Sequence, residues 1–316
     1  MMNETRKTEE PDGVLILNKP AGITSHDCVA QIRRLYHTKK VGHTGTLDPM
    51  ATGVLPILLG RAAKAAEYVT AEGKRYLAVL RLGLTTDTED TSGTVLSTAE
   101  NIPGEDAVQA VLSGFRGSIL QTPPMYSALK VNGEKLCDLA RRGITVEREK
   151  RPVTVYSLTA EKQSDTDYLL DVRCSKGTYI RTLCADIGAA LGCGGVMAAL
   201  CRTESGTFTL ADAHTLAELE EMTEEERLSL PAPTETLFSD CPAITLDGFF
   251  LRLADSGQHI FLHKLPGHTA VSLPEGTLVR MYGREKGFFA LGCVGMYTDD
   301  TGNACPAVKP VKKFVL

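Results

Sequence analysis

Hydrophobic residues follow two periods along the chain, and these periods divide it into predicted strands and helices. Short apolar runs bounded by turn residues predict strands at 14–18, 54–59, 76–82, 153–160 and 168–174. Apolar residues three or four positions apart predict helices at 62–69, 105–112, 134–142 and 179–191. A further helix is expected to begin after Ser25 as its N-cap, with Val29, Ile32 and Leu35 or Tyr36 on its buried face. Because strands and helices do not alternate strictly, the pattern favours an α+β fold over a doubly wound sheet.

The last third of the chain has a different pattern. Thr215 with Glu218, and Thr223 with Glu226, have the spacing of capping boxes, so each pair predicts the start of a short acidic helix. The segment 230–242 contains three prolines and little periodicity, which indicates a linker between domains.

Beyond the linker, a short helix and glycine-punctuated strands indicate a small β-barrel, with strands expected at 277–281 and 288–294. The first residues are polar and lack the apolar core of a secretion signal, so they are expected to form a flexible tail. The predicted organisation is a tail at 1–12, a large domain at 13–245 and a small domain at 246–316.

Composition narrows the possible functions. The apolar stretches are far shorter than a membrane span, so no membrane helix is expected. Nine scattered cysteines include no C-x-x-C pair, which argues against a zinc site or a disulfide framework and favours the reducing cytoplasm. No Walker A motif or dinucleotide-binding glycine motif is present, so no nucleotide cofactor is expected.

The net charge of −5 argues against RNA binding, but the basic residues are unevenly distributed. One cluster comprises Arg33, Arg34, Lys39 and Lys40, and a second comprises Lys130, Lys135, Arg141, Arg142, Arg148, Lys150 and Arg151. Acidic residues concentrate at 218–226. A basic face and an acidic back can coexist at this net charge, although each cluster alone is also typical of a solvated surface.

The segment 42–56 holds one carboxylate, Asp48, among glycines, threonines and a histidine. Pro49 disfavours the helical region for Asp48, which places the carboxylate on an extended or turn backbone. A lone carboxylate in such a loop suggests a nucleophile or a proton acceptor rather than a metal site. The alternative is a turn in which Asp48 bonds its own backbone, and composition alone favours that alternative.

Seven segments in order along residues 13–210 resemble motifs of one enzyme family. They are 17–25 (LNKPAGITS), 42–56 (GHTGTLDPMATGVLP), 73–76 (GKRY), 83–90 (GLTTDTED), 121–130 (QTPPMYSALK), 174–181 (CSKGTYIR) and 200–206 (LCRTESG). Together they resemble the TruB-type family of bacterial tRNA pseudouridine-55 synthases. The resemblance implies an α+β pseudouridine synthase fold, with a mixed, largely antiparallel sheet split into halves and a small PUA-like RNA-binding domain at the C-terminus.

The resemblance also implies site residues. Asp48 matches the catalytic carboxylate, Arg181 its ion-pair partner, and Tyr76 the residue that stacks on the flipped uracil. For Arg181 the alternative is a surface helix arginine, and for Tyr76 it is core packing. No metal or cofactor is implied, because the isomerisation oxidises nothing and releases no group.

Other positions match residues that bind or support the substrate site. His43 matches a residue that contacts the extruded nucleotide, and Tyr179 and Leu200 match positions that line the uracil pocket. Lys19 and Pro20 match a supporting motif. A lone histidine or leucine would otherwise be assigned a structural role.

The segment from about 123 to 152 resembles an insertion that closes over the T-arm loop of tRNA, with Cys137 where an aromatic residue is usual. The implied function is isomerisation of uridine to pseudouridine at position 55 of tRNA by base flipping, in a cytoplasmic, monomeric enzyme that does not act at a membrane. The alternatives are a synthase for another RNA and a non-catalytic RNA-binding or tRNA-folding chaperone of the same fold.

Overall fold

The computed structural model describes residues 10–69, 73–131, 133–265 and 273–314. Most of the expected tail at 1–12 lies outside these residues. At its end, the Asp12 carboxylate accepts hydrogen bonds from the backbone N–H groups of Arg61 and Ala62 at 2.7 and 3.2 Å. These bonds attach the start of the described chain to the large domain.

The large domain contains a nine-stranded sheet in which most neighbouring strands are antiparallel. Its main path has the order β1-β3-β12-β4-β11-β10-β7, with β2 beside β3 and β13 beside β12. The bounds are β1 Gly13–Lys19, β2 Val41–His43, β3 Thr52–Leu59, β4 Lys74–Leu82, β7 Gly117–Gln121, β10 Arg151–Lys162, β11 Asp167–Cys174, β12 Gly195–Ser205 and β13 Phe208–Thr209. The five strands predicted from short apolar runs all lie in this sheet, which confirms the expected mixed, largely antiparallel α+β architecture.

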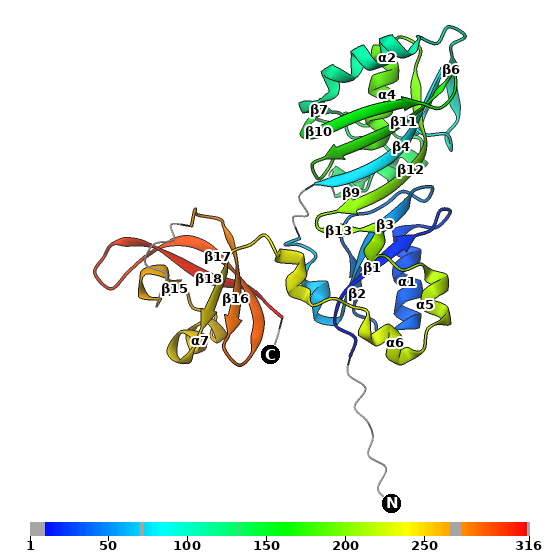
Figure 1. Ribbon diagram of the computed structural model, residues 1–316. Helices are drawn as coiled ribbons and strands as arrows, with labels where there is room; N and C mark the ends of the chain where they lie inside the picture. Colours follow the sequence, from blue (N-terminus) through cyan, green and yellow to red (C-terminus); the bar gives the residue numbers. More distant parts are fainter. Residues whose placement is uncertain (1–9, 70–72, 132, 266–272, 315–316) are drawn as a thin grey trace, which may run out of the picture.

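The sheet divides into two halves that are joined by one short parallel pairing (Figure 1). Strands β12 and β3 pair only through Cys201 with Thr52 and Arg202 with Gly53. Gly53 has φ +103°, and a Cβ there would lie 2.2 Å from the Arg202 carbonyl oxygen. Only glycine therefore permits this close approach between the halves.

Helices cover each half of the sheet. Figure 1 shows α1 (Ser25–Leu35), α5 (Leu216–Glu221) and α6 (Glu224–Ser229) beside β1–β3. It shows α2 (Glu105–Leu112) and α4 (Ile180–Ala190) against the other half. The core beneath them joins residues from both halves, including Leu17, Leu55, Leu80, Leu170 and Leu183. Both predicted capping boxes are confirmed at the starts of α5 and α6.

The start of α1 differs from its prediction. Thr24, rather than Ser25, is the N-cap, because the Thr24 hydroxyl accepts the backbone N–H of Asp27 and the Asp27 carboxylate accepts that of Thr24. Ser25 is buried and exchanges two hydrogen bonds with the backbone of Leu47. Ser25 thus connects this helix to the loop that carries Asp48.

Two other predicted helices are partly wrong. The segment 62–69 does not form an α-helix, since the structure has a 3-10 helix, η1, at Gly60–Ala65 followed by a turn. Its buried Ala62 and Ala65 are three residues apart, which fits three residues per turn. Within 134–142, Glu134–Lys135 forms β9 of a hairpin with β8 (Lys130–Val131), and α3 covers only Leu136–Arg141.

Two smaller hairpin strands, β5 (Leu84–Thr86) and β6 (Val95–Thr98), follow β4, and short 3-10 turns occur at η2 (Ser113–Phe115) and η3 (Leu210–Asp212).

The segment 230–242, which was expected to be a linker, is packed against the large domain rather than extended between domains. Val14 and Ala232 exchange backbone hydrogen bonds, and η4 spans Thr234–Phe238. The Phe238 ring lies 6.3 Å from that of Phe314 and 6.4 Å from that of Phe288.

A second sheet follows with the order β14-β16-β17-β18-β15 and its own hydrophobic core. Its elements are β14 Ala243–Leu246, α7 Gly248–Asp255, β15 Ile260–Phe261, η5 Leu262–Lys264, β16 Leu278–Gly283, β17 Gly287–Thr298 and β18 Ala304–Lys313. The expected β-rich C-terminal unit is therefore present, and its first strand begins at Ala243. No helix among the described residues is long and apolar enough to cross a membrane.

Candidate active site

The loop that carries Asp48 connects β2 to β3, and a buried lysine donates hydrogen bonds to its backbone. Lys19, at the end of β1, has no exposed surface. Its ammonium group donates to the carbonyl oxygens of Pro20, Pro49 and Ala51 at 2.9, 3.1 and 2.7 Å. Burial lowers the pKa of Lys19. Three carbonyls around one cation fix the backbone on both sides of Asp48, which suits the supporting role expected for Lys19 and Pro20.

We expect the change Lys19→Met to destabilise the protein, because it leaves three inward-facing carbonyls without a donor. The loss should be on the order of 3 kcal/mol in the free energy of unfolding, measured by urea denaturation. Lys64→Met, at an exposed position on η1, is the matched control and should change stability by less than about 0.5 kcal/mol. Equal effects of the two changes would mean that the three contacts contribute nothing.

Asp48 forms an ion pair with an arginine from the other half of the sheet. Arg181 Nε lies 3.0 Å from Asp48 Oδ2, and Nη2 donates to Asp48 Oδ1 at 3.4 Å. Arg181 follows the first residue of α4 and is 5% exposed, whereas the Asp48 side chain is 35% exposed. Its remaining N–H groups donate to the carbonyls of Thr88 and Tyr126 at 3.0 and 2.7 Å. One oriented, partly accessible carboxylate thus faces solvent beside a buried guanidinium.

Burial raises the pKa of Asp48 above its ordinary value. The Arg181 guanidinium acts in the opposite direction, and the nearby Asp90 carboxylate raises the pKa further. The Arg181 guanidinium thus favours the ionised form of Asp48, but the effect of burial is larger. The result is a carboxylate that is more basic than an exposed aspartate.

Asp90 is a site residue to which sequence reasoning assigned no role. Its side chain is 7% exposed, and Oδ2 lies 3.6 Å from Arg181 Nη1. Its other oxygen accepts hydrogen bonds from the Thr88 hydroxyl at 2.8 Å and the Ser92 backbone N–H at 2.9 Å. Its place at the end of the motif 83–90 could have marked Asp90 as a candidate site residue, but nothing in the sequence indicates that this turn contacts Arg181.

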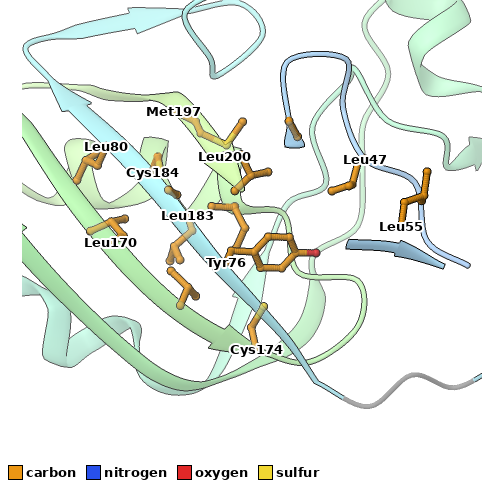
Figure 2. Close-up of a cluster of buried hydrophobic side chains, with 14 of the residues drawn as sticks. Leu47, Leu55, Tyr76, Leu80, Leu170, Cys174, Leu183, Cys184, Met197 and Leu200 are labelled. Atoms are coloured by element: carbon orange, nitrogen blue, oxygen red, sulfur yellow. The ribbon is translucent and has the colours of Figure 1, made fainter. Parts of the chain in front are cut away.

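Tyr76 lies on β4 among apolar side chains at the join between the two halves of the sheet. Figure 2 shows its ring near Leu200 and Cys174, with the hydroxyl directed towards Leu47 and Leu55. Leu47 directly precedes Asp48, so the ring is close to the Asp48 loop. Tyr76 is 6% exposed, and burial raises the pKa of its hydroxyl, which favours the protonated form.

Leu200 and Tyr179 border the same region. Leu200 is paired with Ala78 next to Tyr76, and its carbonyl accepts the Thr52 hydroxyl at 3.4 Å across the join. Tyr179 precedes α4, and its backbone N–H and C=O both bond the side-chain amide of the buried Gln121. These two bonds fix the backbone position of Tyr179, which lies two residues before Arg181 and has a half-buried ring.

His43 is the last residue of β2, just before the loop that carries Asp48. Its ring contacts that of His26 edge-on at 5.8 Å, and its buried Nδ1 has no hydrogen-bond partner among the described residues. Burial lowers the pKa of His43, which favours the neutral imidazole. Among the described residues, no side-chain hydrogen bond or ring contact joins His43 to Asp48 or Tyr76. The described part of the chain also contains no group of three or more His, Cys, Asp or Glu side chains that could hold a metal ion.

Comparison with known proteins gives a consistent result. The model of the TruB family pseudouridylate synthase N-terminal domain matches residues 33–180. That of the tRNA pseudouridylate synthase B C-terminal domain matches residues 181–238, which end before the second sheet. The tRNA pseudouridine synthase B of Burkholderia mallei (strain NCTC 10247) is 45% identical over 271 residues, or 86% of this chain and 89% of the relative. The corresponding protein of Francisella tularensis subsp. tularensis (strain WY96-3418) is 46% identical over 237 residues, or 74% of this chain and 78% of the relative.

Solved structures with the same fold include a Cbf5-Nop10-Gar1 complex, with a TM-score of 0.74 and 28% identity over 96% of this chain and 85% of the other. An H/ACA RNP bound to a substrate RNA containing 2′-deoxyuridine has a TM-score of 0.72 and 26% identity over 97% of this chain and 86% of the other.

Proposed function

The chain belongs to the TruB family of pseudouridylate synthases, and from that premise we propose that it converts uridine 55 in the T-arm loop of tRNA to pseudouridine. Its relatives in Burkholderia mallei and Francisella tularensis are tRNA pseudouridine synthases. The observation that carries the proposal is the Asp48 carboxylate, which is partly exposed and oriented by the buried Arg181. The preceding residue, Leu47, lies in the same hydrophobic cluster as the Tyr76 ring.

The reaction breaks the bond from the ribose C1′ to N1 of uracil, rotates the base and forms a bond from C1′ to C5. The hydrogen on C5 leaves as a proton, and N1 gains a proton, so that the atoms balance without an oxidant. Asp48 acts on the base, on the sugar or as a proton acceptor, and each of these roles requires an ionised, oriented carboxylate. Arg181 supports this requirement because it contacts both oxygens of Asp48.

The target uridine must leave the RNA stack to reach Asp48. We assign Tyr76 to stacking against the extruded base, since an aromatic face suits a planar pyrimidine. Tyr179 and Leu200 border the proposed uracil pocket and would keep the detached base from escaping. His43, on the strand before the loop, is assigned to contact with the extruded nucleotide.

RNA binding beyond the pocket is assigned to the insertion at 123–152 and to the C-terminal sheet as a PUA-like domain. Arg141, the last residue of α3, and Arg142, which follows it, are both exposed, although Arg141 pairs with Asp138 and Arg142 with Glu134, both at 3.0 Å. Exposed ion pairs of this kind contribute little to stability, so both arginines can exchange their carboxylate partners for RNA phosphates. Eight of the described cysteines are free thiols, namely Cys28, Cys137, Cys174, Cys184, Cys193, Cys201, Cys293 and Cys305. These free thiols fit the proposed cytoplasmic location, and we propose that the enzyme acts as a monomer.

The alternative of another RNA substrate has one observation in its favour. The structurally similar chains occur in a Cbf5-Nop10-Gar1 complex and in an H/ACA RNP with a substrate RNA. The tRNA assignment is preferred because the tRNA enzymes share 45% identity, against 26–28% for these complexes. The non-catalytic alternative is disfavoured because Asp48, Arg181 and Tyr76 are all present.

The test is tritium release from C5-labelled uridine in a T-arm stem-loop. We expect release that saturates with RNA, and mass analysis should place the product at position 55. A second stem-loop of unrelated sequence is the matched control. Release from both RNAs alike would favour a broader substrate range, and binding without any release would favour a non-catalytic protein.

The stacking role of Tyr76 can be separated from a role of its hydroxyl. Tyr76→Phe keeps the aromatic face, whereas Tyr76→Leu removes it and keeps an apolar side chain. If stacking dominates, the leucine variant should lose about 1–3 kcal/mol of binding to the flipped base, and the phenylalanine variant much less. Affinity for a stem-loop with a 5-fluorouridine target reports this loss. Equal damage from both changes would implicate the hydroxyl instead.

A further inference from the structure

Two cations that have no role in the proposed chemistry converge on the Asp48 loop. A Cβ built on Gly45 would lie 3.2 Å from Lys74 Nζ and 3.4 Å from Arg202 Nη1. Gly45 has φ +82° and precedes Asp48 by three residues. The absence of a side chain at Gly45 therefore leaves room in which the two charged groups approach the same point.

Arg202 is fully buried, and only part of its guanidinium is satisfied. Nε donates to the Val54 carbonyl at 2.7 Å, and Nη2 donates to the Gly45 carbonyl at 3.1 Å. Nη1 is buried and meets no acceptor in hydrogen-bond geometry among the described residues, although the guanidinium is close enough to the Tyr76 hydroxyl to act against the rise in its pKa that burial causes. A buried charged donor without a well-placed acceptor is costly, so an acceptor supplied by a ligand would be favoured here.

Lys74 supplies the accessible side of this pair. It is half-buried at the start of β4 and forms no ion pair within the described chain. Burial and the neighbouring Arg202 lower the pKa of Lys74 to about 8. Two close cations without a carboxylate would each gain from a shared anion, which would relieve their repulsion.

A third donor lies beside them on the sheet. Ser205 is the strand partner of Lys74, and its buried hydroxyl has no hydrogen-bond partner among the described residues. Ser205 also lines a neighbouring cavity of about 340 Å³, whose wall includes Thr44 but neither Lys74 nor Arg202. Lys74 and Arg202 offer only donors at this point and the Ser205 hydroxyl can donate its hydrogen, whereas a phosphodiester presents only acceptor oxygens and one negative charge.

We infer that Lys74 and Arg202 form a binding site for one backbone phosphate of the RNA, at or next to the nucleotide on which Asp48 acts. The inference rests on the proposed function. Lys74 and Tyr76 are two residues apart on β4 and thus project from the same face of the sheet. A uridine placed between Tyr76 and Asp48 carries phosphates on both sides of its ribose, and one of them would reach the Gly45 loop. The site would hold the backbone while the base turns.

The test combines neutral phosphates in the RNA with a neutral residue in the protein. Stem-loops carrying one methylphosphonate at each loop position in turn are measured for affinity against wild type and Lys74→Met. We expect Lys74→Met to bind unmodified RNA roughly tenfold more weakly. Its slope of log affinity against log salt should be smaller by about 0.7–0.9. At one position near the target, the methylphosphonate should weaken wild type but not the variant.

Lys74→Arg, which keeps the charge, should bind within threefold of wild type and retain the sensitivity at that position. Lys162→Met, at the exposed far end of β10, is the matched control and should behave as wild type. If the loss of binding free energy from Lys74→Met and the loss from each methylphosphonate are additive at every position, the site does not bind phosphate. Turnover of unmodified RNA by wild type is measured separately, so failure of the proposed function is distinguished from failure of this inference.

Discussion

Replacing Asp48 by asparagine is expected to abolish turnover, with a loss of roughly 10⁴-fold or more. Asparagine has nearly the same size and can still contact Arg181, but it can neither attack the substrate nor accept a proton at neutral pH. Affinity for the stem-loop should remain within a few-fold, because the change removes no phosphate contact. Tritium release at saturating RNA and a filter-binding titration measure the two quantities separately.

Asp106→Asn, at an exposed position in the first turn of α2, is the matched control and should leave turnover unchanged. Both variants should be purified from a host that lacks its own synthase, so that traces of wild type do not mask the loss. Appreciable turnover by the Asp48 variant in such a preparation would remove Asp48 from the catalytic role. A parallel loss of affinity would assign it to binding instead.

Replacing Arg181 by methionine should reduce both stability and activity. The change leaves two carboxylates, Asp48 and Asp90, close together without their shared cation, and it removes the donors to two backbone carbonyls. We expect a loss of about 3–5 kcal/mol in the free energy of unfolding. Turnover should fall by roughly 10³-fold, because Asp48 loses the group that orients it.

The sign of the pH dependence follows from the charges. Arg181 lowers the pKa of Asp48, so its removal should raise that pKa further above the unfolded value. The native state then binds protons more tightly than the unfolded chain, and the stability deficit should shrink as the pH falls from 8 towards 5. Any remaining activity should disappear at a higher pH than in wild type as the solution is acidified.

Two further variants separate charge from geometry. Arg181→Lys keeps a cation but not the planar fork, so it should recover part of the stability and little of the activity. Adding Asp90→Asn to Arg181→Met removes one of the two facing carboxylates and should restore stability. If the double variant is no more stable than the single one, repulsion between the carboxylates does not contribute to the deficit.

The sequence predicted elements whose cause is local. The apolar runs of β3, β4 and β11 and the capping boxes of α5 and α6 lie within single segments, and all five are present in the structure. The predictions were wrong where two local conformations differ little in free energy. Thr24 and Ser25 can each cap α1, and tertiary contact with Leu47 determines which of them does. The alanine-rich segment after β3 winds as a 3-10 helix because Ala62 and Ala65 are both buried there.

The residues of the candidate site could not be predicted from hydrophobic periodicity alone. Asp48 stood out as a lone carboxylate in a glycine-rich loop, but its pairing with Arg181 came from family resemblance. Asp90, Lys74 and Arg202 received no role, because their place depends on strand register and on pairing across more than a hundred residues, which for Asp90 is its bridge to Met197. The alignment of Arg202 with both Tyr76 and Gly53 is a property of the assembled sheet and of no single segment.

The short pairing of β12 with β3 has a mechanical consequence. Asp48 belongs to one half of the sheet, while Arg181 and Tyr76 belong to the other. Within the part of the chain that the structure describes, the strand pairing between the halves consists of two residue pairs. Side-chain bonds from Thr52 to Leu200 and from Arg202 to Val54 reinforce this junction. A small shear between the halves would therefore displace the carboxylate relative to the aromatic ring while each half stayed rigid. The stiffness of this junction sets how accurately the catalytic groups are aligned, so substitutions there should alter alignment before they alter the fold.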